Sequence, residues 1–256
     1  MSEVEVLRSD LLAVPHGFLG RQGGVSKGEM WGLNVGYGSG DDPGLIAENR
    51  RRAVEAVLPG AQLATVHQVH SPTVVYVENA WPQDDRPHAD AMVTDRPGVL
   101  LGVLAADCAP VLFGDAEAGV IGAAHSGWRG AVSGLNEATI VAMEGIGAER
   151  DRIAAVVGPC VSQASYEVDQ GFRDRFVEQD DANAGFFTAG PVGKPHFDLP
   201  GYILHRLKLA GIQRATALEQ DTYSDPGRFY SYRRSTHLNE PSYGRQISMI
   251  GLPARS

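Results

Sequence analysis

Residues 99–106 of this 256-residue chain, VLLGVLAA, are apolar at every position. A β-strand with one solvated face alternates apolar and polar residues, whereas a strand buried on both faces is apolar throughout. The run includes a glycine, ends at Asp107 and is far too short to cross a bilayer. It therefore predicts a central strand with packed layers on both sides.

The other apolar runs are short and are separated by Pro, Gly, Asp and Asn, as strands usually are. They predict strands at 62–66, 74–77, 91–94, 111–113, 120–124, 153–157, 215–218 and 246–252. Further segments predict helices at 45–58, 131–145, 169–178 and 200–210. Asp42 and Asp198 are suitable caps for the first and last of these helices. Strands grouped in runs, with helices between the groups, favour an α+β layered fold.

Residues 16–44 are rich in glycine and predict an irregular loop, and no linker divides the chain. We therefore expect residues 1–256 to form a single domain. The net charge of −9 argues against a general affinity for nucleic acid or for an anionic membrane. The segment MSEVEVLRSD is acidic where a secretory signal would be basic, and only two cysteines occur. We expect a cytoplasmic protein without disulfides, and nothing implies an obligate protein partner.

Two histidines and one cysteine lie far apart in the chain, within apolar or glycine-rich stretches. They are His70 in HQVHS, Cys108 in AADCAPVLF and His125 in GAAHSGWRG. Cys108 follows the 99–106 run, and we expect Pro110 to stop the strand ladder there. His125 follows the strand 120–124, so Cys108 and His125 both lie at strand ends, where side chains can converge.

These three side chains would suit a zinc ion whose fourth position stays open to water or substrate. His67 lies three residues before His70, and in an extended segment the two point to opposite faces. Only one of the two is expected to reach a shared metal, and spacing alone does not choose between them. The separations of 38 and 17 residues match no local zinc signature. A buried thiol and ordinary hydrogen-bonded histidines would also account for the three residues.

A set of sequence words resembles the YfiH or "laccase-domain" family, first labelled multicopper polyphenol oxidase and later described as purine nucleoside phosphorylase. In chain order the words are GRQGGVS, LNVGYGSGDD with Asn49-Arg50, HQVHS, AMVTD, AADCAPVLF, HSGWRG, GPC, SYEV, YSYRR and GRQISMIGL. They run from about residue 16 to residue 252. HQVHS, ADCAP and HSGWRG together are highly specific, whereas any one alone would be weak.

The resemblance implies mixed β-sheets flanked by helices in an α/β/β/α layering. It also implies a zinc site with one ligand from each of three words, His70, Cys108 and His125. The reactions described for the family are phosphorolysis of adenosine, inosine, guanosine and methylthioadenosine, and deamination of adenosine. The resemblance therefore implies a zinc-dependent enzyme whose partners are a purine nucleoside and phosphate.

Phosphorolysis requires a pocket for an anion, and the arginine fork suits phosphate because it binds with two N–H groups. Arg129, just after His125, is the best placed candidate, and Arg50 and Arg245 are further candidates for substrate binding. Trp128 could stack on a purine or could serve ordinary packing. With Arg129, the ligands Cys108 and His125 are the candidate catalytic residues.

The general acid or base is not assigned by the sequence. Asp107, beside Cys108, could orient a ligand or a water molecule. Glu167 and Asp90 are other carboxylates near the words of the site, although Asp90 could equally be a structural cap. The H-x-E and P-C-x-x-C words of familiar zinc deaminases are absent. Cys160 is expected to be a buried, inert thiol.

Three alternatives to a zinc phosphorylase remain open. Two histidines and a cysteine are also the ligands of blue-copper sites, although only eight histidines occur and no H-x-H pair. Cys108 could instead be a nucleophile activated by His125, in a cysteine hydrolase or amidase that acts on peptidoglycan precursors. A closed, non-catalytic zinc site would need a fourth ligand, for which His67 is the candidate.

Overall fold

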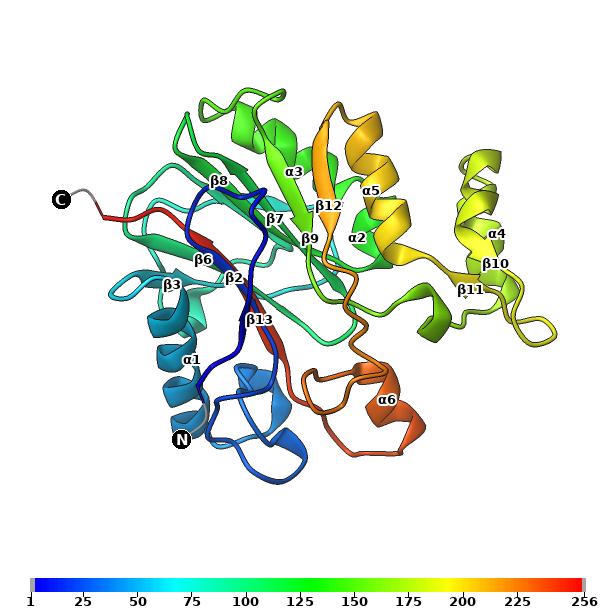
Figure 1. The fold of residues 1–256 in the computed structure, drawn as a ribbon, viewed down its shortest axis with the longest axis horizontal. Helices are drawn as coiled ribbons and strands as arrows, with labels where there is room; N and C mark the ends of the chain where they lie inside the picture. Colours follow the sequence, from blue (N-terminus) through cyan, green and yellow to red (C-terminus); the bar gives the residue numbers. More distant parts are fainter. Residues whose placement is uncertain (1–2, 255–256) are drawn as a thin grey trace.

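The strand predicted from the apolar run is the centre of a five-stranded sheet. In the computed structural model, which describes residues 3–254, β6 (Val99–Ala105) is buried at all of its residues. It pairs antiparallel with β13 (Gln246–Gly251) and parallel with β3 (Gln62–Ala64). β2 (His16–Leu19) and β1 (Val6–Leu7) complete the order β1-β2-β13-β6-β3 (Figure 1).

A second, six-stranded sheet carries the two strands on which Cys108 and His125 depend. Its order is β12 (Arg214–Ala217), β9 (Ala154–Val157), β7 (Ala109–Asp115), β8 (Val120–Ser126), β5 (Ala91–Thr94) and β4 (Val74–Tyr76). β7 and β8 form an antiparallel pair in which Pro110 lies opposite His125. Because β12 is parallel to β9 and β4 is parallel to β5, the sheet is mixed, as expected.

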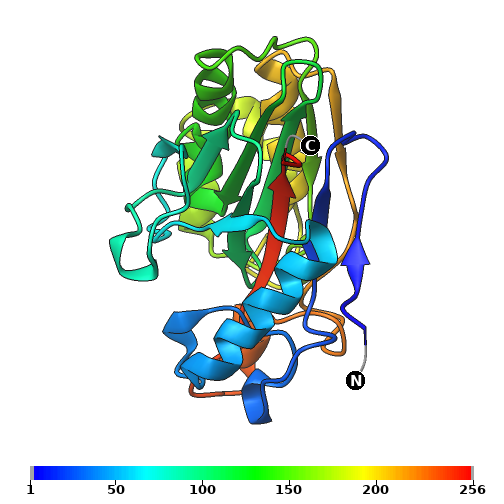
Figure 2. The same cartoon turned by 90° about the vertical axis from the view of Figure 1, so that its left-hand side faces the viewer.

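The two sheets pack face to face, and alternation along each strand divides their side chains between layers. In β6, Leu101 faces the six-stranded sheet and packs in one cluster with Leu112 of β7. Its neighbour Leu100 faces the other way and shares a cluster with residues of α1 (Pro43–Val57). Figure 2 shows α1 lying across β13 on this outer side. Because both faces of β6 are covered by apolar layers, residues 99–106 are apolar throughout.

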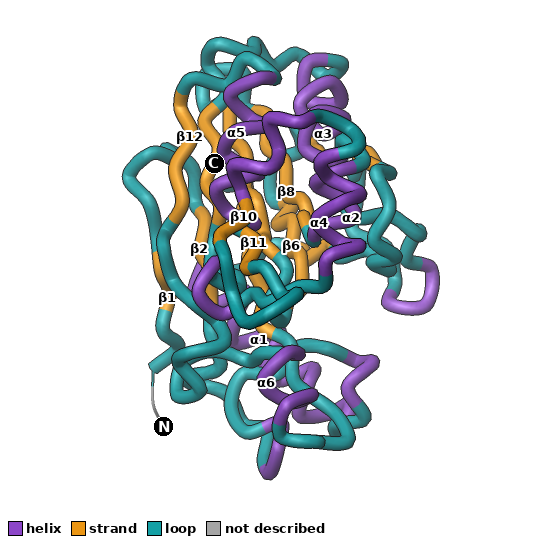
Figure 3. Tube along the Cα trace, turned by 90° about the vertical axis from the view of Figure 1, so that its right-hand side faces the viewer, coloured by secondary structure: helices purple, strands orange, loops and turns teal. Residues whose placement is uncertain are grey.

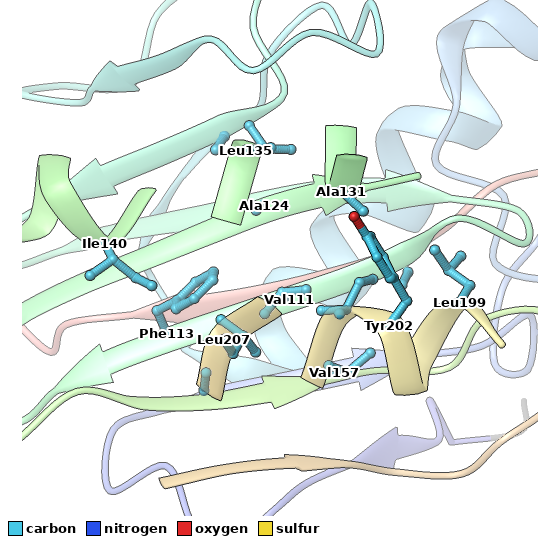
Figure 4. Close-up of a cluster of buried hydrophobic side chains, with 14 of the residues drawn as sticks. Val111, Phe113, Ala124, Ala131, Leu135, Ile140, Val157, Leu199, Tyr202 and Leu207 are labelled. Carbon is cyan, nitrogen blue, oxygen red and sulfur yellow. The ribbon is translucent and has the colours of Figure 1, made fainter. Parts of the chain in front are cut away.

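The outer face of the six-stranded sheet is covered by α3 (Leu135–Glu144) and α5 (Leu199–Leu209). Val111 and Phe113 of β7 point to this side and pack with Ile140 of α3 and Leu207 of α5 (Figure 4). The predicted α+β fold with α/β/β/α layering is therefore confirmed. None of the helices within residues 3–254 combines the length and apolarity that crossing a bilayer requires.

The predicted helix at 131–145 is wrong at its start. Two helices occupy this region, α2 (Trp128–Val132) and α3, and they are separated at Gly134. Gly134 has φ of +86°, which a right-handed helix excludes and glycine adopts readily. The other predicted helices are confirmed within one or two residues. Asp42, Asp169 and Asp198 each cap the next helix by accepting hydrogen bonds from its first turn.

The expectation that Pro110 stops the ladder is also wrong, because Pro110 lies within β7. In an antiparallel sheet, the N–H and C=O groups of one residue point to the same neighbouring strand. The carbonyl of Pro110 accepts a hydrogen bond from Gly158 N at 2.8 Å, so its missing N–H would have pointed to that side. The pairing of β7 with β8 therefore continues to the residue beside Cys108.

The remaining elements are short, and apart from α4 the sequence did not predict them. α6 (Tyr232–His237) lies apart from the helices α2 to α5, and α4 (Gln170–Val177) packs beside the strand pair β10 (Phe187–Thr188) and β11 (His196–Phe197) (Figure 3). β2 lies inside the glycine-rich segment that was expected to be irregular. The 3-10 helices are η1 (Gly28–Met30), η2 (Tyr37–Ser39), η3 (Gln83–Asp85), η4 (Gln163–Ser165) and η5 (Asp181–Phe186).

Candidate metal centre

The three predicted ligands converge, although 55 residues separate the first from the last. The possible ligand atoms of His70, Cys108 and His125 all lie within 4.8 Å of one another. Cys108 Sγ lies 3.9 Å from His70 Nε2, and the two imidazole centroids are 5.0 Å apart. His125 is buried, Cys108 is half-buried and His70 is exposed, so the group is accessible on one side. Two nitrogens and a sulfur form a donor set that can hold a metal ion.

No fourth His, Cys, Asp or Glu joins this group among residues 3–254. His67, the residue that could have closed it, stacks instead on His88 with ring centroids 4.5 Å apart. A structural zinc site normally has four protein ligands, whereas a catalytic site keeps one position open. The three-ligand arrangement therefore matches the catalytic kind.

One carboxylate, Asp90, positions two of the three ligands. Its Oδ1 lies 3.0 Å from His125 Nδ1, which leaves the Nε2 of that ring for a metal. Its Oδ2 accepts hydrogen bonds from Val69 N and from Ser71 N and Oγ, on both sides of His70. These bonds hold His70 in a left-handed conformation with φ of +61°.

The charge of Asp90 is stabilised by the same contacts. Burial raises the pKa of this carboxyl, but hydrogen bonds from His125 and Ser71 outweigh it and lower the pKa to about 2. Asp90 is therefore ionised at neutral pH and orients the imidazole of His125, as carboxylates commonly do for metal-binding histidines. Asp90 also caps the backbone around His70 through Val69 N and Ser71 N, so its structural contacts and its contact with His125 occur together.

Cys108 is positioned through the residue before it. Asp107 has φ of +88°, and its carboxylate accepts hydrogen bonds from Thr222 Oγ1, Ser231 Oγ and Arg233 N. Burial raises the pKa of Asp107 even though these donors oppose the rise. Its carboxylate is thus fully engaged with residues of the last third of the chain. It fixes the turn that presents Cys108 and makes no hydrogen bond to the candidate ligands.

Gly127, in the word HSGWRG, leaves the space that the ligands fill. A Cβ added to Gly127 would lie 2.8 Å from Cys108 Sγ and 3.3 Å from His70 Cδ2. The first distance is far shorter than a normal carbon–sulfur contact, so any side chain would displace the thiol. A glycine at this position is therefore a condition for the three ligands to meet.

The thiol and the buried imidazole perturb each other electrostatically. Burial would raise the pKa of Cys108, but the positive charge and hydrogen bonds of His125 and His70 lower it to about 6. Burial would lower the pKa of His125, but Cys108 and Asp90 raise it to about 9. At neutral pH the metal-free group therefore contains a thiolate beside an imidazolium. The thiolate is the form that binds metals and acts as a nucleophile.

A cavity of about 370 Å³ opens beside the group, which is enough for a small organic ligand. Its lining includes two candidate ligands, His70 and Cys108, and two residues predicted for the substrate, Trp128 and Arg129. Arg129 Cζ and Arg175 Cζ lie 5.3 Å and 5.5 Å from the centroid of the Trp128 ring. This ring also packs edge-on against Phe172, so Trp128 forms part of a packed aromatic wall.

Two other predicted substrate residues, Arg50 and Arg245, lie outside this cavity. Arg50 stacks on Tyr37 with Cζ 4.6 Å from the ring centroid, and its Nε donates to Val35 O. Arg245 stacks in the same way on Tyr243. A role for either arginine in substrate binding stays a prediction.

Two further residues named from the sequence also lie outside the ligand group. Glu167 forms an ion pair with Lys194 at 3.0 Å and lines a neighbouring pocket. Cys160 is buried, and burial raises the pKa of its thiol, which fits the expected inert cysteine.

The cavity is also lined by five polar or aromatic residues that the sequence did not single out, namely Tyr166, Tyr232, Arg233, Thr236 and His237. All of them lie in SYEV, in YSYRR or just after it. These words contribute to the family resemblance, but nothing in their sequence connects them to the site. Only the fold shows that α6 closes one side of the cavity, since it lies more than 100 residues after Cys108.

Comparison with known proteins places this geometry in a family. A model described as multi-copper polyphenol oxidoreductase laccase matches residues 15–253. A purine nucleoside phosphorylase from Deinococcus radiodurans is 40% identical over 253 residues, 98% of this chain and 94% of that protein. Purine nucleoside phosphorylase ORF3 from Streptomyces griseus is 39% identical over 219 residues, 85% of this chain and 87% of that protein.

Solved structures agree with this result. A Neisseria meningitidis protein has a TM-score of 0.87 and 31% identity, covering 99% of this chain and 100% of that one. The protein YfiH from Bacillus licheniformis has a TM-score of 0.87 and 25% identity, covering 98% and 97%. The resemblance to the YfiH or laccase-domain family is confirmed. This chain belongs to the multi-copper polyphenol oxidoreductase laccase family.

Proposed function

We propose that this chain is a zinc-dependent purine nucleoside phosphorylase of the cytoplasm, acting on adenosine, inosine, guanosine and methylthioadenosine. The observation that carries the proposal is a three-ligand group, His70, Cys108 and His125, beside a cavity of about 370 Å³ that also contains Arg129. The names of the relatives from Deinococcus radiodurans and Streptomyces griseus support the reaction. Both substrates are small molecules, so the proposal includes no nucleic acid, membrane or protein partner.

In phosphorolysis, a phosphate oxygen bonds to C1′ of the ribose while the bond from C1′ to the purine nitrogen breaks. The electron pair of the broken bond leaves with the base, and positive charge develops on the sugar. A zinc ion held by His70, Cys108 and His125 would supply a Lewis acid beside the cavity. Arg129 provides a positive charge for phosphate, and its fork can donate two hydrogen bonds to two phosphate oxygens.

The direct test is incubation of the zinc-loaded protein with inosine and inorganic phosphate. We expect hypoxanthine and ribose 1-phosphate to form in equal amounts, and only when phosphate is present. Cys108→Ala, which removes the sulfur ligand, should lose both zinc and activity while its thermal unfolding remains cooperative. If the zinc-loaded protein releases no hypoxanthine, the proposed reaction is wrong.

Adenosine deamination is proposed as a second activity of the same cavity. In deamination, a water oxygen would bond to C6 of the purine while the C6–N bond breaks and ammonia leaves, so adenosine should yield inosine and ammonia in phosphate-free buffer. The group that transfers the proton cannot be the glutamate of an H-x-E word, because the chain lacks that word. Failure to detect inosine would remove this activity and leave the phosphorylase intact.

A cysteine hydrolase or amidase, acting on peptidoglycan precursors, is the second candidate function. The observation in its favour is the sequence of contacts from Cys108 to His125 to Asp90, in which a thiolate, an imidazole and a carboxylate follow one another. A metal and an acyl substrate would compete for the same sulfur. Iodoacetamide labelling of Cys108 that zinc does not suppress would favour the hydrolase.

A copper-dependent polyphenol oxidase is the reaction that the family description names. The donor set of two imidazoles and one thiolate also suits copper, so metal analysis must separate the two cases. We expect a colourless protein with one zinc per chain. Stoichiometric copper with a thiolate-to-copper absorption band would favour the oxidase.

A further inference from the structure

We infer that Arg233 and Arg129 together form an oxyanion subsite in the metal cavity, and that Arg233 is the second arm that holds inorganic phosphate. The identity of the anion as a co-substrate rests on the proposed function. The existence of the subsite rests on the geometry of the two arginines, and direct measurement of phosphate binding distinguishes it from the proposed function.

Both arginines line the same cavity as His70 and Cys108. Within residues 3–254, neither guanidinium makes a hydrogen bond or an ion pair, although acidic residues outnumber basic ones by 31 to 22 over the whole chain. Several other arginines are paired, as Arg152 is with Asp115 and Arg228 with Glu5. Two unpaired guanidinium groups that line one cavity present several N–H donors to it. An anion in the cavity could accept hydrogen bonds from these donors.

Each of the two guanidinium groups stacks on an aromatic ring. The stacking restrains the position of the guanidinium but leaves its N–H donors available. Arg233 Cζ lies 5.0 Å from the Tyr166 centroid, and Arg129 Cζ lies 5.3 Å from the Trp128 centroid. Tyr166 and Trp128 both pack against Phe172, at 6.0 Å and 4.9 Å between centroids. Stacking uses the face of a guanidinium, whereas its N–H groups point from the edge. The two arginines therefore sit on one rigid aromatic wall.

The backbone of Arg233 is tied to the turn that presents the sulfur ligand. Its N–H donates to Asp107 Oδ2 at 2.7 Å, and Asp107 directly precedes Cys108. The same carboxylate oxygen accepts from Ser231 Oγ at 2.9 Å, which fixes the start of α6. One buried residue thus holds the position of the metal ligand relative to that of Arg233. Such a connection is what a site needs to place an anion at a fixed distance from a metal-bound substrate.

A phosphate site elsewhere on this wall is less favourable. Tyr166 and Arg233 also border a neighbouring pocket that contains Lys194. The ammonium group of Lys194 is neutralised by Glu167 at 3.0 Å, and this carboxylate would repel a dianion there. The unpaired positive charge of Arg129 lies in the metal cavity and not in the neighbouring pocket, so phosphate is expected to bind in the metal cavity.

The experiment measures phosphate directly and in turnover, with Arg233→Gln, Arg233→Lys and Arg129→Gln. In the zinc-loaded protein, calorimetry should show that Arg233→Gln weakens binding of inorganic phosphate by about tenfold to a hundredfold, the loss expected for a charge-assisted hydrogen bond. The KM for phosphate should rise to a similar extent while the KM for inosine changes less than about twofold. Arg233→Lys should recover part of the loss because it restores the charge without the fork.

Arg175→Gln is the matched control, because Arg175 stacks on the same Trp128 but does not line the cavity. Its phosphate binding should equal that of the unaltered protein, and all variants should unfold at similar temperatures. The anion could also be the phosphate group of a nucleotide, and inosine 5′-monophosphate tests this case. Tighter binding of this nucleotide than of inorganic phosphate would overturn the assignment to inorganic phosphate. Unchanged phosphate binding and KM in Arg233→Gln would overturn the subsite. Phosphate binding that depends on Arg233, without any release of hypoxanthine, would support the subsite and contradict the proposed function.

Discussion

Asp90 determines the arrangement of the site more than any residue that is not itself a candidate ligand. It contacts the ring of His125 with one oxygen and both flanks of His70 with the other. Asp107 positions Cys108 in a comparable way. It fixes the turn that precedes Cys108 and does not contact the thiol directly. The three candidate ligands could be named from the sequence because their words are specific. Asp90 and Asp107 were also named as candidates, but the contacts that define their roles were not predictable, because they span 19 to 126 residues of chain.

Asp90→Asn should weaken zinc binding by about tenfold to a hundredfold, as removal of a carboxylate partner of a metal-bound histidine usually does. The amide can still meet His125 but cannot accept the Ser71 donors with the same charge. Competition with a chromophoric chelator measures the affinity. Asp115→Asn is the control, since Asp115 is a buried carboxylate at the far end of β7. Equal zinc affinity in the two variants would contradict the role given to Asp90.

Gly127→Ala should abolish stoichiometric zinc binding, because its Cβ would lie 2.8 Å from Cys108 Sγ. Gly38→Ala is a matched substitution, since a Cβ there would meet nothing within 4 Å. Metal analysis of both purified variants gives the answer. If Gly127→Ala retains a full equivalent of zinc, Cys108 Sγ is not a zinc ligand in the position that the structure gives it.

The metal-free protein should show an unusually acidic thiol at Cys108. Its pKa is lowered to about 6 by His125 and His70 against the effect of burial. The rate of iodoacetamide labelling should therefore reach half its maximum near pH 6 rather than near the ordinary value of about 8.5. Cys160 is an internal control that should stay unlabelled, because it is buried and its pKa is raised. A midpoint for Cys108 above about 8 would be inconsistent with the thiolate–imidazolium pair.

At the scale of elements, the long apolar strands were predictable and the short polar helix α6 was not. β6, β7 and β8 are buried along their whole length, so burial dominates their sequences. α6 has the sequence YRRSTH, which has no apolar stripe, and it is held by the Ser231 cap and by tertiary contacts to Asp107. The residues that α6 brings to the cavity were therefore hidden from the sequence.

The break between α2 and α3 gives a prediction for stability. Gly134→Ala should lower the free energy of unfolding by about 1–2 kcal/mol, because a non-glycine residue at φ of +86° is strained. Gly145→Ala, at the other end of α3, should be neutral or slightly stabilising, since its φ is −60° and an added Cβ would meet only ordinary contacts. Urea unfolding of both variants measures the difference. Equal stabilities would mean that α2 and α3 can join into one helix.

At the scale of the whole molecule, the two-sheet sandwich gathers a site from distant segments. His125 stands near the end of β8, Cys108 just before β7, and His70 in the segment leading to β4, all within the six-stranded sheet and its loops. α6 then follows from the opposite end of the sequence and completes the cavity. The overall charge of −9 gives no hint of a local pair of unpaired arginines.

The measurement that tests the central claim most directly is zinc-edge X-ray absorption on the purified, active protein. Three protein ligands predict one sulfur at about 2.3 Å and two imidazole nitrogens at about 2.0–2.1 Å, with a fourth light atom from water or substrate. Adding inosine and phosphate should change only that fourth neighbour. A second sulfur, a third imidazole, or a spectrum unaffected by both substrates would contradict an open catalytic metal centre.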